Sequence, residues 1–215
     1  MYVIRVEGTV PIGRLVDFEA WIDQFFDQIK QVKGLQAATL LQSLSYPGQF
    51  TGIYRFENRS AAQSMTRDAQ FNSFLQQHPL EGLFIPTRPI EGQETVVFDR
   101  GQGTFGTLTL VDVTIDLKPG NQQAFEQRTT QLLSLVQQHG RGVVVTALTR
   151  LAGSAQRYTI AYGFISMDDG QATMTSPEIA RFREQNPLSQ FGSAAPVGET
   201  SEVVKSLVLA GATTR

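Results

Sequence analysis

Charged side chains alternate with apolar ones in two segments of the first half of the chain, and these charges are the first candidates for chemistry. Arg5 and Glu7 are two residues apart, and so are Arg55 and Glu57. Residues two apart lie on one face of a β-strand, so each segment would present an arginine beside a carboxylate. An arginine can hold a phenolate or carboxylate through two parallel hydrogen bonds, and a carboxylate can accept a proton. We therefore interpret all four residues as candidate catalytic residues.

Polar residues with the same alternation occur in the second half. Thr114 and Asp116 follow Asp112 at spacings of two, and Thr159 follows Arg157. Asp112 and Arg157 are candidate substrate-binding residues on the equivalent strand face. The alternative interpretation is a salt-bridged interface between two sheets, because charges removed from water are stable only when they are paired.

His78 is a further candidate for proton transfer, because imidazole titrates near neutral pH. It lies in FLQQHPL (residues 74–80), which recurs as FREQNPL (residues 182–188) with Asn186 in its place. Asparagine cannot titrate but can cap a helix, so the position also fits a helix end, where histidine interacts favourably with the helix dipole. His139 fits a helix end in the same way. Two histidines without i, i+4 spacing, in a chain without cysteine, predict no metal site.

Aromatic residues recur at spacing two in both halves. Tyr54 precedes Phe56, and Tyr162 precedes Phe164. Aromatic residues that share a strand face usually pack between sheet and helices, so a core is the first expectation. If the faces are reversed, Tyr54 and Tyr162 would line a cavity, and both are therefore candidate substrate-binding residues. Trp21 lies one position off the apolar stripe of its helix and is expected at a partly exposed edge of the core.

An internal repeat relates the two halves and predicts how these residues are positioned. Phe125 follows Phe18 by 107 residues, whereas Phe182 follows Phe74 by 108. We expect the one-residue insertion in the hairpin near Gly153.

Each half has the expected order β-α-β-β-α-β. The strands, predicted from alternation and turn signals, are residues 2–10, 35–45, 50–57 and 93–99, and then 107–117, 143–151, 156–165 and 200–209. Apolar spacings of three and four predict helices at 14–33 and 121–139, and Gly34 should take a left-handed conformation after the first. The second helix of each half should begin at a cap, Ser60 or Asp168, and break at Asp68 or Ser176.

This order is that of the ferredoxin-like unit, whose two helices cover one face of its sheet. Two units that pack through their bare faces would bury both. We predict an α+β protein in which two ferredoxin-like repeats, residues 1–100 and 104–215, pack their antiparallel sheets as an intramolecular dimeric α/β barrel. A linker is expected at about residues 100–106. The chain would thus be a pseudo-dimer, with further homodimerisation left open.

The composition of the chain argues against a nucleic-acid partner and against a membrane partner. The 215 residues carry a formal net charge of −2 and no run of lysine and arginine, so a nucleic-acid partner is not expected. No apolar stretch is long enough for a membrane span, and the first residues are interrupted by Arg5 and Glu7, unlike a signal peptide. We expect a cytoplasmic protein without a membrane partner.

Two segments carry a resemblance to a known family. GIYRFENRSAAQSMTRDAQFNSFLQQHPLEG (residues 52–82) and IAYGFISMDDGQATMTSPEIARFREQNPLSQ (residues 160–190) each combine an aromatic strand, a helix cap, a short helix and a last helix with a spaced phenylalanine. They resemble the antibiotic biosynthesis monooxygenase family of the dimeric α/β-barrel superfamily, here as a fused tandem.

The resemblance implies a cofactor-independent monooxygenase-like protein that acts on a small aromatic or quinol metabolite. Arg5 or Arg55 would stabilise the substrate anion, and Glu7, Glu57 or His78 would take the proton. No cofactor is implied.

The chain departs from the pattern in one respect. Many relatives carry a histidine in the first piece of the second helix, where this chain has Met65 and Met174 or their neighbours. The haem-degrading branch, with asparagine on the first strand and tryptophan and histidine on the second helix, is not matched. The alternative is a non-catalytic or stress-associated protein that binds a small hydrophobic ligand.

Overall fold

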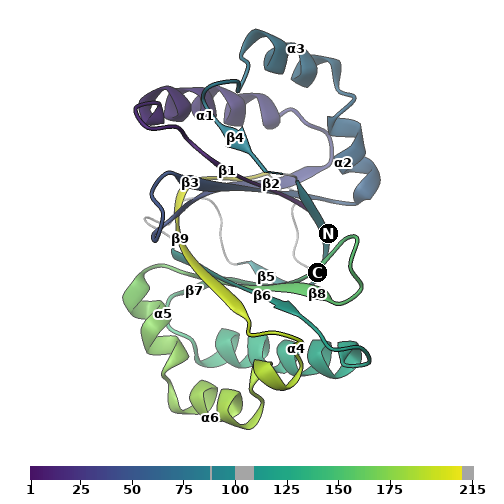
Figure 1. Cartoon of the computed structure of the whole chain (residues 1–215), viewed down its shortest axis with the longest axis vertical. Helices are drawn as coiled ribbons and strands as arrows, with labels where there is room; N and C mark the ends of the chain where they lie inside the picture. Colours follow the sequence, from purple (N-terminus) through teal and green to yellow (C-terminus); the bar gives the residue numbers. More distant parts are fainter. Residues whose placement is uncertain (88, 100–108, 210–215) are drawn as a thin grey trace. The chain divides into compact units, whose positions relative to one another are not determined.

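The computed structural model describes residues 1–87, 89–99 and 109–209, and the linker predicted at about 100–106 therefore lies outside the described residues. Contacts divide the described chain into two compact units. Unit 1 consists of Met1–Glu91 and residues 203–209, and unit 2 of Gly92–Glu202. In each unit an antiparallel sheet carries its helices on one face (Figure 1).

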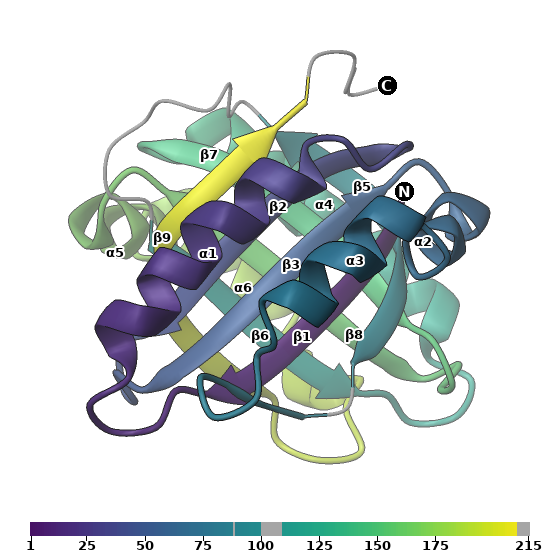
Figure 2. The same ribbon diagram turned by 90° about the horizontal axis from the view of Figure 1, so that it is seen from above.

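Unit 1 is built around the pairing of β1 with β3. Its elements are β1 (Tyr2–Thr9), α1 (Leu15–Ile29), β2 (Leu35–Ser43), β3 (Gln49–Phe56), α2 (Arg59–Met65), α3 (Ala69–Gln77) and β4 (Ile85–Pro86). Strand β3 pairs with β1 on one side and with β2 on the other, all antiparallel. The short β4, which no sequence pattern predicted, pairs with the end of β1. Helices α1 and α3 lie side by side over these strands and run roughly along them (Figure 2).

Unit 2 repeats this arrangement. Its elements are β5 (Ile90–Asp99), β6 (Thr109–Asp116), α4 (Gln122–His139), β7 (Val143–Leu151), β8 (Arg157–Phe164), α5 (Met167–Met174), α6 (Pro177–Gln185), the 3-10 helix η1 (Leu188–Gln190) and β9 (Val197–Val208). The strand order is β9-β6-β8-β7-β5. The predicted α+β class, with two ferredoxin-like repeats and a second helix broken in both, is confirmed.

The last strand of each repeat passes from one unit to the other. Strand β5 begins at the end of unit 1, and from Gly92 onward it pairs with β7 in unit 2. Strand β9 pairs with β6 as far as Glu202, and its remaining residues belong to unit 1, where β2 is its neighbour. The backbone N–H of Leu209 then donates to the carbonyl of Gln36 at 2.9 Å. Each compact unit therefore contains a segment from the other repeat.

The apolar faces pack as the periodicity predicted. Phe18, Phe25 and Ile29 of α1 are buried in the core of unit 1 together with Phe56 of β3, and Tyr54 packs against this core. Phe125, Leu132, Val136 and Phe164 hold the equivalent places in unit 2. The tyrosine strand faces therefore meet the helices, and the charged residues of β1 and β3 lie on the opposite face.

Two predictions of local structure are wrong. Asn58, not Ser60, caps α2, because its side chain accepts the N–H of Ala61 at 2.9 Å. Ser166, not Asp168, caps α5 by accepting the N–H of Asp169. The cap predicted at Asp68 is confirmed, since its carboxylate accepts the N–H of Phe71 at 2.8 Å.

The position of the inserted residue also differs from the prediction near Gly153. Strands β2 and β7 begin at Leu35 and Val143, already 108 residues apart, so the insertion precedes the hairpin. The equivalent residues Ile29 and Val136 are 107 positions apart, whereas the glycines that follow them, Gly34 and Gly142, are 108 apart. The inserted residue therefore lies between Val136 and Gly142 in the second repeat. Both glycines have positive φ, 80° and 59°, so the left-handed conformation predicted at Gly34 is confirmed.

Candidate functional site

Strand β1 brings Arg5 and Glu7 together on the side of the sheet that the helices do not cover. Arg5 Nη2 lies 3.7 Å from Glu7 Oε1, and the two side chains are 12% and 30% exposed. Their spacing of two places both on one strand face, as the sequence predicted. The pair combines an anion-binding guanidinium with a proton-accepting carboxylate in partly desolvated surroundings.

Strand β3 adds two polar residues to the same face. Thr51 is the direct partner of Glu7. Arg55 is the partner of Val3 and lies two residues along β3 from Ile53, the partner of Arg5. Partner residues in an antiparallel ladder share a face, and diagonal neighbours lie about 7–8 Å apart. We call Arg5, Glu7, Thr51 and Arg55 the charged face of unit 1.

Two predicted site residues on or beside β3 are not part of the charged face. The strand ends at Phe56, so Glu57 leaves the sheet; its exposed carboxylate accepts the side-chain N–H of Gln36 at 3.0 Å. Tyr54 points to the helices, with its ring 6.0 Å from that of Phe25. Burial raises the pKa of the Tyr54 phenol, so it acts as a neutral packing group.

His78 also lies on the helix side of the sheet, across from the charged face. It ends α3, where its backbone N–H donates to Phe74 O and its ring stacks on the Phe74 ring at 4.8 Å between centroids. Its carbonyl accepts the indole N–H of Trp21 at 2.7 Å. Asn186 ends α6, and both its backbone N–H and its side-chain N–H donate to the carbonyl of Phe182. The helix-end interpretation of this repeated position is thus confirmed.

Trp21 is buried, with 7% of its surface exposed, rather than partly exposed as its place beside the stripe suggested. Its ring stacks on Phe25 at 4.8 Å and lies 5.8 Å from Phe74. The prediction failed because α3 covers this edge of α1, a contact that the helical wheel of α1 alone cannot reveal.

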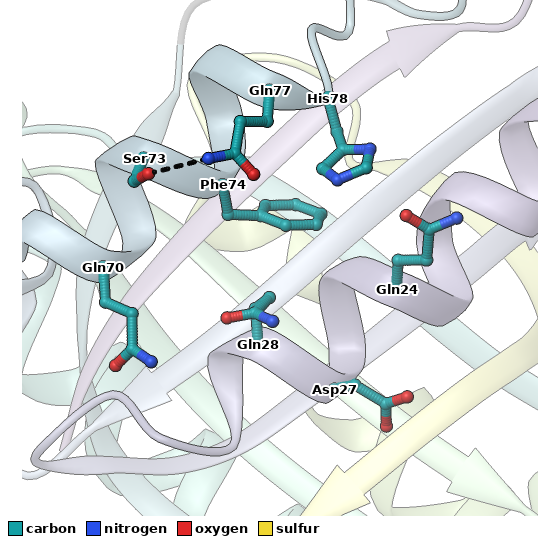
Figure 3. A pocket seen from close by; sticks show the side chains of 8 residues that line it. All are labelled: Gln24, Asp27, Gln28, Gln70, Ser73, Phe74, Gln77 and His78. Atoms are coloured by element: carbon teal, nitrogen blue, oxygen red, sulfur yellow. Dashed lines mark hydrogen bonds between the residues drawn. The ribbon is translucent and has the colours of Figure 1, made fainter.

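A groove of about 400 Å³ lies between α1 and α3 in unit 1 (Figure 3). Helix α1 contributes Gln24, Asp27 and Gln28, and α3 with its last turn contributes Gln70, Ser73, Phe74, Gln77 and His78. Sequence reasoning missed every one of these except His78. The available signal was the i, i+4 spacing of Gln24 and Gln28 and the i, i+7 spacing of Gln70 and Gln77, which place each pair on one helix face.

The candidate residues of unit 2 are dispersed. Asp112 is buried on β6 opposite Ala161 of β8. Arg157 lies at the exposed start of β8 and pairs with Asp116 at 3.6 Å. Tyr162 is buried in the helix-side core, and this burial raises the pKa of its phenol.

Neither a metal cluster nor a membrane-spanning helix occurs among the described residues. In them, no cluster of three or more histidine, aspartate or glutamate side chains could hold a metal ion. No described helix has both the length and the apolar character needed to cross a membrane.

Comparison with known proteins identifies solved structures with a similar fold but no relative by sequence. No family model and no curated protein matches the sequence. Among solved structures, a protein from Fusobacterium nucleatum named "putative monooxygenase" has a TM-score of 0.82 at 10% identity, covering 96% of this chain and 94% of that one. An anthrone oxidase-like protein has a TM-score of 0.66 at 10% identity, covering 99% and 96%.

A third neighbour carries the family name. It is an uncharacterised ferredoxin-fold protein from Listeria monocytogenes related to antibiotic biosynthesis monooxygenases, with a TM-score of 0.55 at 15% identity and 94% of each chain covered. The resemblance to antibiotic biosynthesis monooxygenase-like proteins is confirmed. At such low identities these likenesses establish the fold, and the activity has to be argued from the site.

Proposed function

We propose that the chain is a cofactor-independent monooxygenase-like protein that oxidises a small aromatic or quinol metabolite at the charged face of unit 1. The observation that carries the proposal is the Arg5–Glu7 pair, in which an anion-binding group and a proton acceptor lie 3.7 Å apart on one strand. The names of two structural neighbours, a "putative monooxygenase" and an anthrone oxidase-like protein, support the reaction class.

The proposed reaction starts with proton transfer from the substrate to Glu7. Arg5, with Arg55 on the same face, stabilises the resulting oxyanion, because a guanidinium donates two hydrogen bonds where negative charge develops. The electron-rich carbon of the anion then reduces dioxygen directly. With anthrone, one oxygen atom enters the new carbonyl of the quinone, and the other leaves as water with the two hydrogens of the oxidised methylene.

Dioxygen consumption with anthrone as substrate tests the proposal. We expect uptake above that of heat-denatured protein, and a fall in kcat of about 10²–10³-fold for Arg5→Gln, the loss typical of an oxyanion-stabilising donor. The matched control is Arg14→Gln, which removes an exposed arginine that pairs with Asp17 at 2.9 Å. Uptake equal to the heated sample, or an equal loss in both variants, would overturn the proposal.

A non-catalytic role is the second candidate, favoured by one observation. Met65 and Met174 pack against the cores of the two units at or near the positions where the resemblance implies a histidine. Without that imidazole the protein would bind a small hydrophobic ligand and leave it unchanged. Saturable binding of anthraquinone without any oxygen uptake from anthrone would favour this role over catalysis.

A further inference from the structure

The groove between α1 and α3 has the size of a ligand site and lies on the helix side of unit 1, away from the charged face. Its volume of about 400 Å³ falls within the range of small-molecule sites, roughly 300–1,000 Å³. Figure 3 shows Gln24 and Gln28 from one helix and Gln77 from the other around the ring of Phe74. Two helices therefore direct amide groups toward one space.

Most of these polar groups have no hydrogen-bond partner among the residues that the structure describes. Among the described residues, Gln77 donates to the Ser73 hydroxyl at 3.2 Å, whereas the side chains of Gln24, Gln28 and His78 make no hydrogen bond. Each glutamine amide offers two donor hydrogens and an acceptor oxygen. The imidazole, held by its stacking on Phe74, adds a flat ring at the rim of the groove.

The charge of the groove limits the ligand class. No lysine or arginine lines it, so it offers no permanent cation to hold a phosphate or carboxylate. Its one carboxylate, Asp27, already pairs with Lys30 at 2.6 Å. A neutral ligand with several closely spaced hydroxyl groups matches donors and acceptors of this kind, and the C–H face of its ring can lie on the imidazole.

We infer that the groove between α1 and α3 binds a neutral polyhydroxylated ring, the chemistry of a mono- or disaccharide. The inference goes beyond the proposed oxidation and uses none of its residues, because His78 lies on the helix side of the sheet, away from the charged face.

The second repeat provides an internal comparison. At its equivalent positions Leu135 replaces Gln28, Glu178 replaces Gln70 and Arg181 replaces Ser73. Gln131 and Gln185 keep the amides of Gln24 and Gln77, so the same fold forms without the amides of Gln28 and Gln70, and packing alone does not require these two.

Trp21 provides the readout, because it is the single tryptophan of the chain and its indole N–H donates to the carbonyl of His78. We expect a saturable change in fluorescence when glucose, galactose, N-acetylglucosamine or maltose is titrated. Ligand-observed saturation-transfer NMR with the same sugars measures binding without relying on the indole. The double variant Gln28→Leu/Gln70→Glu, which introduces the residues of the second repeat, should raise Kd at least about tenfold.

The control is Gln127→Leu, an exposed glutamine on α4 that should leave Kd unchanged. Arg5→Gln should also leave sugar binding unchanged, so the failure of the oxidation and the failure of this inference are separable. Absence of binding to all four sugars by both methods, or an unchanged Kd in the double variant, would overturn the inference.

Discussion

Tyr158 of β8 shows how a single polar atom is accommodated in the core of unit 2. Its ring is fully buried and lies 5.1 Å from that of Phe125, while its hydroxyl donates to the carboxylate of Glu126 at 2.5 Å. Burial first, and then this hydrogen bond to a carboxylate, raises the pKa of the phenol to about 12. The folded protein therefore favours the neutral phenol.

This shift predicts a loss of stability at alkaline pH. The phenol ionises near pH 10 in the unfolded chain, about two pH units before it does in the folded one, so its contribution is complete below about pH 10 and is lost as the pH rises toward about 12. Tyr158→Phe should cost about 1 kcal/mol at neutral pH through the lost hydrogen bond. It should also make the alkaline decline shallower.

Urea unfolding of both proteins at neutral pH and above about pH 10 measures the two effects. Tyr54 and Tyr162, whose pKa values burial also raises, stay in both proteins, so some alkaline decline should persist in the variant. An alkaline slope that the substitution leaves unchanged would contradict the assignment to Tyr158.

At the scale of elements, the broken second helix depends on side chains that cap its two pieces in unit 1. Asn58 begins α2 and Asp68 begins α3, and each accepts a backbone N–H three residues ahead. These bonds satisfy donors that a short helix cannot pair internally. The break before α3 matters for the site, because it sets the position of the helix that forms one wall of the groove.

A pair of substitutions distinguishes the observed cap from the one that the sequence suggested. Asn58→Ala should destabilise the protein by about 1 kcal/mol, whereas Ser60→Ala, inside α2, should change stability by only a few tenths of that. Chemical denaturation followed by Trp21 fluorescence compares the two variants. A larger cost for Ser60→Ala would restore the cap that the sequence predicted at Ser60.

At the scale of the whole molecule, strand β9 ties the end of the chain to unit 1. Leu207 and Leu209 pack against the core of that unit, and Lys205 pairs with Asp23 of α1 while its ammonium lies 5.6 Å from the centre of the Phe26 ring. Unit 1 therefore draws part of its core from a segment that is remote in sequence.

Truncation after Glu202 should destabilise unit 1 more than unit 2. The loss of the two partly buried leucines and of the strand that carries them should lower the stability of unit 1 by about 2 kcal/mol or more. Hydrogen exchange should accelerate in β2, at the edge where β9 is missing, and less in β7. A chain that ends at Leu209 keeps the described strand and serves as the control; equal acceleration in β2 and β7 would contradict the assignment of the two units.

Much of the fold could be predicted because its signals are local. Alternation along residues 2–10 and helical spacing along 14–33 depend on neighbours within a few positions, and the repeat supplied the same order twice. The cap at Asn58 was missed because capping depends on where the chain enters the helix, which competing serine and asparagine residues leave ambiguous. The two-residue β4 was missed because so short a strand has no measurable period.

Less of the candidate site was predictable. Spacing placed Arg5 beside Glu7 correctly, yet the same spacing put Glu57 beside Arg55, and β3 ends before Glu57. The groove escaped detection because its walls come from two helices about 45 residues apart in the chain, and polar exposed glutamines carry no signal of their own.

By itself, the sequence determined that the protein is a duplicated α+β fold, and which strand faces are aromatic and which are charged, because those properties follow from the periods of single elements. Only the tertiary structure decided that His78 lies across the sheet from Arg5, that α1 and α3 leave a groove between them, and that β5 and β9 change units. These features arise from packing between segments that are distant in the chain, and no local pattern encodes that packing.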